Sequence, residues 1–259
     1  MTRSVEPFTI LIVNYRTQIL TRLCMSLLKK HVDLSRNDVV VVDNGSNDGS
    51  LAYLRSLNWI KLVEREQGID EPAFISHGQA LDEGIKHCKT EYVCLIHTDT
   101  FIYDAQVFDM LLGEVSIEGV AAAGTKNQRH RKAYRKMLRT AKKATRYFFQ
   151  SILLDLGLTN KGPKPYKDGH LKSFCCMWDA NLIKKHELKF STGSMNPGYE
   201  MQNTLTELGY KFVDVGTRAL FNYLSHVQSG TVVEINEEKK NVRRNLEYQK
   251  IVKETMSTL

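Results

Sequence analysis

The chain has 259 residues, of which 42% are hydrophobic and 25% are charged, with a formal net charge of +7 and a pI near 9.1. These proportions are ordinary for a globular protein, and no apolar run approaches the roughly 18 residues of a membrane-spanning helix, which excludes a transmembrane protein. The start, M-T-R-S-V-E-P, lacks the apolar core of a signal peptide, and the five cysteines show no metal-binding spacing. We therefore expect a cytosolic protein with buried, reduced thiols, whose charge fits a nucleic acid, an anionic membrane or a phosphorylated substrate.

Short apolar runs along the first half of the chain predict the strands of a parallel sheet. They are Phe8–Val13, Val39–Val42, Ile60–Val63 and Tyr92–Ile96. Helical periodicity follows the first run and fills residues 73–88, and strand–helix–strand units of this spacing are right-handed and parallel. The strand ends would then place these polar residues on one rim of the sheet: Asn14, Tyr15 and Arg16; Asp43 and Asn44; Glu64 and Arg65; His97 and Asp99.

The fourth run ends in His97, Thr98 and Asp99. Ligands of open α/β sheets bind beyond the carboxyl ends of the strands, where a nitrogen and a carboxylate can hold a divalent cation. The alternative is a loop in which Asp99 caps a helix that begins near Asp104.

Four characteristic sequence segments, which include the predicted strands and the residues after them, occur in a fixed order along the chain. They read F-T-I-L-I-V-N-Y-R-T, V-V-V-D-N-G-S-N-D-G-S, H-G-Q-A-L-D-E-G-I and a strand ending in H-T-D-T. This order resembles the family 2 glycosyltransferases, well over residues 7–112 and more loosely over 171–230. The resemblance implies the nucleotide-sugar-binding GT-A fold, an α/β fold with a mixed, mainly parallel sheet flanked by helices, in which a Rossmann-like nucleotide-binding half joins an acceptor half.

The resemblance also implies roles for the strand ends in donor binding. Asp43 would contact the base or ribose beside Asn44, while Asn14, Tyr15 and Arg16 line the base pocket. The purely structural alternative is that Asp43 caps a helix, a role that Asp48 fits better.

The resemblance makes Asp99 the last carboxylate of the family's Asp-x-Asp motif, which binds the metal. His97 stands where that motif has its first Asp and would face the ribose or add a nitrogen ligand, with Thr98 between the two residues. His77 or Asp82 would lie beside the sugar diphosphate, unless they only form a polar first helical turn.

The second half carries the residues expected on the acceptor side. The resemblance implies that Glu200 is the last acid of the family's Glu-Asp-x-Asp-like motif and the only one present here. It would be the general base, with Asp179 as the second candidate. Trp178 would stack on a sugar or else lie in the core, and His226 would complete the metal site with Asp99 unless it is structural. The alternative for Glu200 is a first-turn acid that the helix dipole favours.

A basic segment between Lys126 and Arg146 separates the two halves. No acidic residue occurs from Gly119 to Leu154, and apolar residues recur among the lysines and arginines at spacings of three and four, which predicts a basic amphipathic helix. We expect it to meet an anionic membrane, with Tyr147, Phe148 and Phe149 dipping in, or the diphosphate of a lipid-linked acceptor. A solvated face over a core helix is the alternative, and no recognition motif supports nucleic acid.

These expectations combine into one hypothesis. Residues 1–259 would form a single GT-A-like domain, with a nucleotide-sugar-binding half (7–118), a basic amphipathic insertion (119–168), an acceptor and catalytic half (169–232) and a helical tail (233–259). It would transfer a sugar from a nucleotide-sugar donor to a glycan or lipid-linked acceptor with inversion, using Mn²⁺ or Mg²⁺, in cell-surface polysaccharide or lipopolysaccharide synthesis. It would be cytoplasmic, or peripheral on the cytoplasmic face of the inner membrane. The rival reading is a non-catalytic nucleotide- or glycan-binding module; a sugar nucleotidyltransferase would need a Gly-rich, basic loop that Asn14–Thr17 does not supply.

Overall fold

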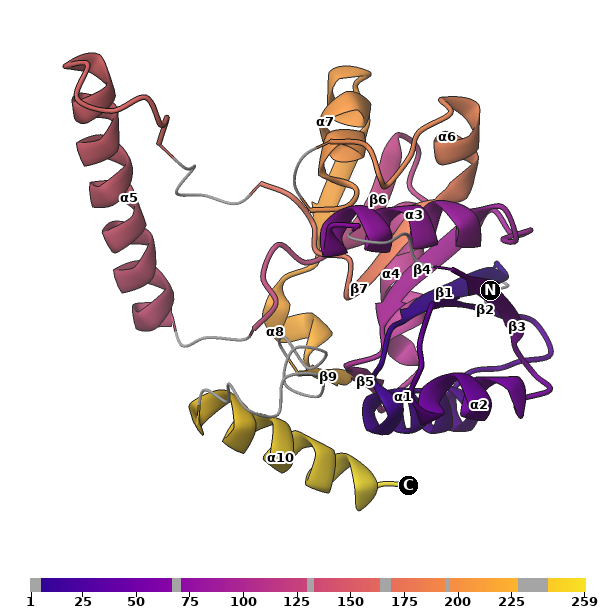
Figure 1. The fold of residues 1–259 in the computed structure, drawn as a ribbon. Helices are drawn as coiled ribbons and strands as arrows, with labels where there is room; N and C mark the ends of the chain where they lie inside the picture. The colour runs from indigo at the N-terminus through magenta and orange to yellow at the C-terminus, as the bar shows by residue number, and fades with distance from the viewer. Residues whose placement is uncertain (1–5, 67–70, 130–132, 164–168, 194–195, 228–241) are drawn as a thin grey trace. The chain divides into compact units, whose positions relative to one another are not determined.

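A computed structural model describes residues 6–66, 71–129, 133–163, 169–193, 196–227 and 242–259 (Figure 1). The chain forms two compact units, one of residues 1–128 and 171–259 and the other of residues 129–170. The second unit contains the helix α5 (Ala133–Asp155). None of the helices in the described part of the chain is long and apolar enough to cross a membrane.

The first unit alternates strands and helices through its first half. Its elements are β1 (Phe8–Asn14), α1 (Gln18–His31), β2 (Asp38–Asn44), α2 (Gly49–Arg55), β3 (Lys61–Arg65), α3 (Ala73–Ile85), β4 (Tyr92–His97), β5 (Thr100–Ile102), α4 (Gln106–Val115), β6 (Val120–Gly124), β7 (Cys175–Asp179), α6 (Ala180–Lys185), α7 (Tyr199–Glu207), β8 (Lys211–Asp214), α8 (Thr217–Leu220), β9 (Leu224–His226) and α10 (Val242–Met256).

Seven of these strands form one sheet in the order β3-β2-β1-β4-β7-β6-β8. Strand β7 runs antiparallel to both β4 and β6, whereas the other neighbours are parallel, so the predicted mixed, mainly parallel sheet is confirmed. The register aligns Asn14 with Asp43, Val13 with His97 and Asn44 with Arg65. The polar ends of four strands therefore lie level at one edge of the sheet.

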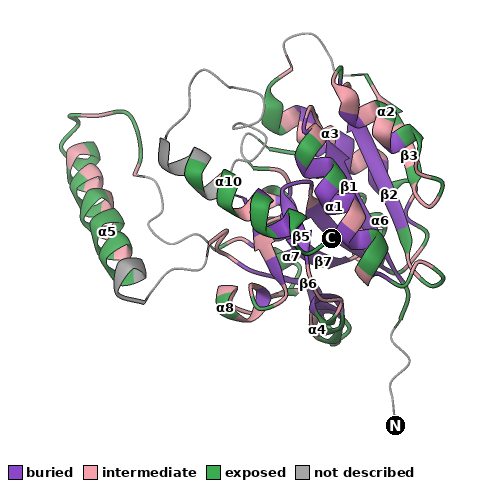
Figure 2. Cartoon of the chain, turned by 90° about the horizontal axis from the view of Figure 1, so that it is seen from below, coloured by how far each residue is buried: buried purple, intermediate pink, exposed green. Residues whose placement is uncertain are grey.

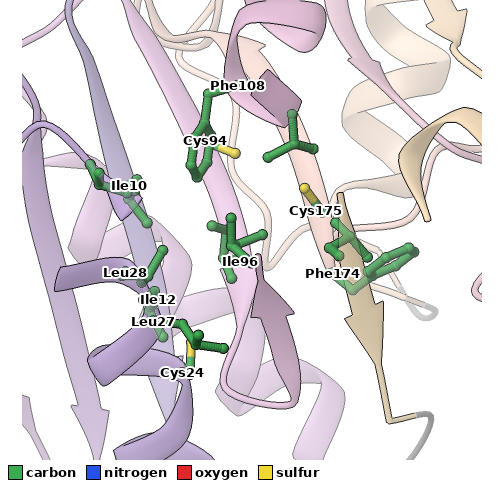
Figure 3. Close-up of a cluster of buried hydrophobic side chains, with 14 of the residues drawn as sticks. Ile10, Ile12, Cys24, Leu27, Leu28, Cys94, Ile96, Phe108, Phe174 and Cys175 are labelled. Atoms are coloured by element: carbon green, nitrogen blue, oxygen red, sulfur yellow. The ribbon is translucent and has the colours of Figure 1, made fainter. Parts of the chain in front are cut away.

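Two apolar layers cover the sheet, because successive residues of each central strand point to opposite faces. Ile10 and Ile12 pack with Leu27 and Leu28 of α1 on one face, whereas Leu11 packs with α3, α6 and α7 residues on the other. Figure 3 shows part of the first layer, where β1, α1, β4 and β7 meet. All five cysteines are buried and free, as the sequence predicts. Figure 2 shows the buried strands between helices that are exposed on their outer sides.

Two predicted boundaries are corrected by the structure. The insertion expected over 119–168 starts later, because residues 120–124 form β6 inside the sheet, next to β7 and β8. Its sequence, V-A-A-A-G, carries almost no β-branched signal, so only pairing with its neighbours defines it. The basic helix expected over 126–146 is α5, which begins at Ala133 and extends to Asp155. The first part of the expected helical tail lies outside the described residues, and α10 forms the rest.

Candidate functional site

Asn14, at the end of β1, is a buried hub of hydrogen bonds. Its side chain is fully buried. The Nδ2 group donates to Asp43 Oδ1 at 2.6 Å, Ser50 Oγ at 2.9 Å and Ser46 Oγ at 3.1 Å, and Oδ1 accepts from Thr21 Oγ1 at 2.6 Å and Thr17 Oγ1 at 3.2 Å. Because the amide group is fully engaged, Asn14 holds the ends of β1 and β2 together and turns no free polar atom toward a ligand.

The Asp43 carboxylate shapes the turn that follows β2. It is 1% exposed, and its second oxygen, Oδ2, accepts the backbone N–H of Ser46 at 2.9 Å. Asp48 caps α2 instead, by accepting the N–H of Ser50 at 3.1 Å, which settles the alternative role considered for Asp43. Asp43 thus fixes the D-N-G-S turn beside which a nucleoside would bind.

Tyr15 and Arg16 form the half-exposed part of this edge. Arg16 has a positive φ of 50°, and its backbone N–H donates to Ser46 Oγ at 3.0 Å. Its guanidinium lies over the Tyr15 ring, 5.0 Å from the centroid. Its buried Nε has no hydrogen-bond partner within the described ranges. An aromatic face and a guanidinium together offer stacking and a charged donor to a base or phosphate.

Arg65, at the end of β3, organises the neighbouring part of the edge, a role that its sequence pattern did not predict. Its guanidinium donates to Asn44 Oδ1 at 2.5 Å and lies 3.1 Å from Glu71 in an ion pair. Asn44 in turn donates to Ser76 Oγ at 2.7 Å. Burial alone would raise the pKa of Glu71, but hydrogen bonds from Ser76 and Arg65 lower it below the usual value. The available signal in the sequence was the place of Arg65 just after a predicted strand, on the same rim as Asn44.

Four side chains gather beyond the end of β4, and we call them the histidine–aspartate cluster: His77, His97, Asp99 and His226. Asp99 Oδ1 lies 3.3 Å from His226 Nδ1 and 3.9 Å from His97 Nδ1. The His97 ring is 6.2 Å from the His226 ring and 5.3 Å from the His77 ring, centroid to centroid, in edge-on orientations. The structure therefore brings together residues from α3, β4 and β9 that the sequence assigned to donor and metal binding.

A two-stranded sheet holds His226 beside Asp99. β5 and β9 pair antiparallel with Thr100 opposite His226, and Val227 N–H donates to the Asp99 carbonyl at 2.9 Å. The His226 ring stacks on Phe174, 4.3 Å between centroids and 17° between planes. Asp99 does not cap the following helix, because Asp104 accepts the N–H of Gln106 there at 2.9 Å.

Burial keeps two imidazoles of the cluster neutral. It lowers the pKa of His97 to about 3, helped by the neighbouring His77 and opposed by the charge of Asp99. It lowers the pKa of His77 to about 4, again against the attraction of Asp99. At neutral pH, His77 and His97 therefore add no positive charge beside the Asp99 carboxylate.

The residues fit a divalent cation that is completed by oxygens of a ligand. Oxygen and nitrogen ligands about 2.1 Å from a cation at right angles lie about 3 Å apart, close to the 3.3 Å between Asp99 and His226. The buried Nε2 of His77 has no hydrogen-bond partner among the described residues. No group of three or more His, Cys, Asp or Glu in the described part of the chain is placed to hold a metal alone. The mixture of nitrogen and carboxylate suits Mn²⁺ better than Mg²⁺.

Glu200 lies in the first turn of α7. A residue of α3 holds the loop that precedes this helix. The Asp82 carboxylate accepts the N–H groups of Phe190 at 2.6 Å and Ser191 at 3.1 Å. A Cβ on Gly193, whose φ is +97°, would lie 2.4 Å from Glu200 Cγ, so only glycine fits there. Asp82, considered above for sugar contact, thus positions the loop that precedes Glu200.

Lys172 and Ser173 connect this acidic side to the cluster, a link that the sequence analysis missed. The Lys172 ammonium lies over the ring of Tyr199, 4.9 Å from its centroid. Ser173 Oγ is 3.0 Å from His97 Nε2. Tyr199, the residue before Glu200, is thus linked through Lys172 to the segment that contacts the cluster.

Two expected site residues lie at the opposite edge. Trp178 pairs with Val93 and Asp179 with Tyr92, at the start of β4, whereas His97 stands at its end. Trp178 is 2% exposed and packs edge-on against Phe190, and Asp179 caps α6 by accepting the N–H of Asn181 at 2.8 Å. Because β7 runs antiparallel to β4, its last residues lie beside the start of β4; Trp178 takes the core position that was its alternative, and Asp179 caps α6.

Comparisons with known proteins bear on the family and the fold. The family model described as "Glycosyl transferase family 2" matches residues 9–176. A mannosyltransferase from Pyrobaculum calidifontis, in complex with GDP-Man and Mn²⁺, has a similar structure (TM-score 0.56, 14% identity, 81% of this chain and 55% of that one). TarS 1-349 from S. aureus is similar too (TM-score 0.50, 14% identity, 93% of this chain and 69% of that one). The chain thus spans about half of the mannosyltransferase chain. A search of curated proteins finds no match.

Proposed function

Since the chain belongs to glycosyl transferase family 2, we propose that it transfers a sugar from a nucleotide-sugar donor to an acceptor hydroxyl, with inversion at the anomeric carbon. The observation that carries this proposal is the approach of His226 to Asp99 at the carboxyl end of β4, level with the ends of β1 and β2. Ligands of open α/β sheets bind at this edge.

The donor nucleoside would lie along the ends of β1 and β2. Tyr15 offers a ring for the base, and Arg16 a guanidinium for the diphosphate. Asp43 and Asn44 would bind the base or ribose from the turn that Asn14 and Arg65 hold rigid. His77, His97 and Thr98 would face the sugar diphosphate.

Asp99 and His226 would hold a Mn²⁺ or Mg²⁺ ion, which when bound neutralises negative charge that develops on the departing diphosphate. Asp99 contributes the carboxylate and His226 the imidazole, 3.3 Å apart. The mannosyltransferase with a similar fold holds GDP-Man and Mn²⁺, and this supports Mn²⁺ as the first ion to test.

Glu200 would act as the general base. It takes the proton of the acceptor hydroxyl as that oxygen attacks the anomeric carbon; the new carbon–oxygen bond forms as the bond to the phosphate oxygen breaks, and the nucleoside diphosphate leaves. Glu200 stands in the first turn of α7. Asp82 anchors the loop before Glu200, and Gly193 leaves room for the Glu200 side chain.

The acceptor would be a glycan or a lipid-linked molecule in cell-surface polysaccharide or lipopolysaccharide synthesis. The protein would work in the cytoplasm or as a peripheral protein on the cytoplasmic face of the inner membrane, where such acceptors reside. The basic helix α5 supports the second of these locations, at the membrane surface.

A panel of nucleotide sugars tests the proposal. We expect one donor to stabilise the protein only with Mn²⁺ or Mg²⁺ in a thermal-shift screen, to bind in calorimetry, and to be hydrolysed slowly without acceptor. Stabilisation by no donor would contradict the proposal. Because His97 replaces an acid, a non-catalytic binding module is the second candidate; binding with neither hydrolysis nor transfer would favour it.

A further inference from the structure

Helix α5 carries a row of exposed apolar side chains. Met137, Ala141, Ala144, Phe148 and Ile152 follow one another at spacings of four, three, four and four, which places them on one side of a helix. Met137 is 74% exposed, Phe148 60% and Ile152 55%. Leu138 and Phe149 flank the row and are also exposed. We call these seven residues the apolar stripe.

The opposite side of α5 is basic. Arg139, Lys142, Lys143 and Arg146 recur at spacings of three, one and three, roughly half a turn from the apolar stripe. We call them the basic face. No acidic residue within this part of the sequence offsets their charge, since none occurs from Gly119 to Leu154.

We infer that α5 binds in the plane of an anionic lipid bilayer, with the apolar stripe among the acyl chains and the basic face toward the headgroups and water. A helix with strong segregation of apolar and basic sides and low overall hydrophobicity is the type that lies in a membrane interface. Phe148 and the neighbouring Tyr147 pack edge-on, with ring centroids 5.7 Å apart, and supply the bulky aromatic surface that inserts at this depth. Binding of α5 to a bilayer does not depend on the proposed reaction; only its biological meaning rests on the proposed function.

Charge and shape favour a bilayer over two other partners. A second copy of α5 packed stripe to stripe would cover the apolar side chains but leave both basic faces on the outer sides, with no opposite charge to meet them. A nucleic acid would neutralise the basic face but leave the apolar stripe in water. An anionic bilayer satisfies both sides of the helix at once.

Co-sedimentation of the full chain with vesicles is the first test. We expect binding to phosphatidylcholine vesicles with about 30% phosphatidylglycerol and little binding to phosphatidylcholine alone, because basic residues are attracted to an anionic surface at about 1 kcal/mol each, or about fivefold in affinity. The double variant Lys142→Gln/Lys143→Gln should bind about 25-fold more weakly. Lys250→Gln, an exposed lysine of α10, is the matched control.

Apolar variants test the insertion itself. Phe148→Ser/Phe149→Ser should lose at least tenfold in binding, while Ile117→Ser/Leu208→Ser, which removes two exposed apolar side chains from the other unit, should bind like the wild type. Circular dichroism of each variant checks that the fold persists. Equal binding to both vesicle types, or an equal effect of both pairs of serine substitutions, would overturn the inference.

Tryptophan placement tests the orientation. With brominated lipids, a Phe148→Trp variant should be quenched above the background of Trp59 and Trp178, whereas Lys143→Trp should not. Equal quenching, or retention of the chain by polyuridylate with none by anionic vesicles, would overturn the inference in favour of another partner. Donor stabilisation measured without vesicles reports on the proposed function separately, so either result can fail alone.

Discussion

The Nδ1 of His226 lies 3.3 Å from the Oδ1 of Asp99, although the two residues come from distant parts of the sequence. The pairing of β5 with β9 produces this approach, and the stacking of His226 on Phe174 fixes its angle. A carboxylate and an imidazole at this separation are the pair that we propose to hold a cation together with a diphosphate.

Asp99→Asn should remove cation-dependent donor binding. In the wild type, Mn²⁺ with a nucleoside diphosphate at about 100 times its Kd should stabilise the fold by about 2.7 kcal/mol, and Asp99→Asn should show no such gain, because the amide lacks the negative charge that holds the ion. Thermal unfolding with and without EDTA measures this. Asp38→Asn, at the exposed start of β2, is the control, and a full Mn²⁺ response in Asp99→Asn would refute the metal assignment.

Glu200→Gln should lower kcat by about 100- to 10,000-fold, since it removes the group that takes the acceptor proton. The Kd for the donor should not change, because we propose that Glu200 acts on the acceptor and does not bind the donor. Glu207→Gln, at the other end of the same helix, should leave kcat intact. Rates that match the wild type in Glu200→Gln would exclude Glu200 as the base.

Asp82→Ala should lower kcat about tenfold with little change in KM for the donor, because the loop before Glu200 loses its two anchoring hydrogen bonds and Glu200 is less well placed. Asp82→Asn, which keeps one acceptor oxygen, should recover part of the rate. The loss of charged hydrogen bonds should also cost about 2 kcal/mol of unfolding free energy. A raised KM with normal kcat would instead indicate that Asp82 contacts the donor.

The stability of the metal-free protein should fall as the pH drops from about 6.5 toward 4. The folded-state pKa of His77 is about 4, below the ordinary 6.5, so between these values the unfolded chain binds a proton that the folded chain does not. The free energy of unfolding therefore decreases by at most about 1.4 kcal/mol per pH unit for each such histidine. His97, with a pKa of about 3, adds a decline of the same sign.

Denaturant titrations at several pH values in EDTA measure this slope. His77→Phe should flatten it, because the substituted side chain binds no proton in either state, whereas His87→Phe, outside the cluster, should not. An unchanged slope in His77→Phe would show that His77 takes up its proton in the folded protein too.

Asn14→Ala should lower the free energy of unfolding by about 3 kcal/mol, because buried partners, Asp43 and Thr21 among them, lose hydrogen bonds and no water replaces them. Urea unfolding monitors the loss. Asn37→Ala is a milder control, because it removes only a half-buried hydrogen bond from Phe8 and an exposed one to Asp33. An effect of Asn14→Ala no larger than that of the control would contradict the role of Asn14 as a hub.

Local patterns in the sequence determine much of this protein. The continuous apolar runs of β1, β2 and β4 and the turn residues after them identify a parallel sheet and the edge where its polar residues gather, since burial on both faces demands such runs. The helical spacing of basic and apolar residues likewise identifies α5, because one helix face needs no distant partner to be recognised. Asp48 as the cap of α2 is equally local.

Only the tertiary structure decided which distant residues meet and which do not. The antiparallel direction of β7 sends Trp178 and Asp179 to the far edge, and no local signal encodes strand direction. The strand β6 and the Arg65 network depend on pairing with neighbours, and the approach of His226 to Asp99 depends on a second small sheet. These features depend on contacts between segments that are far apart in the sequence, so no single segment carries the information that determines them.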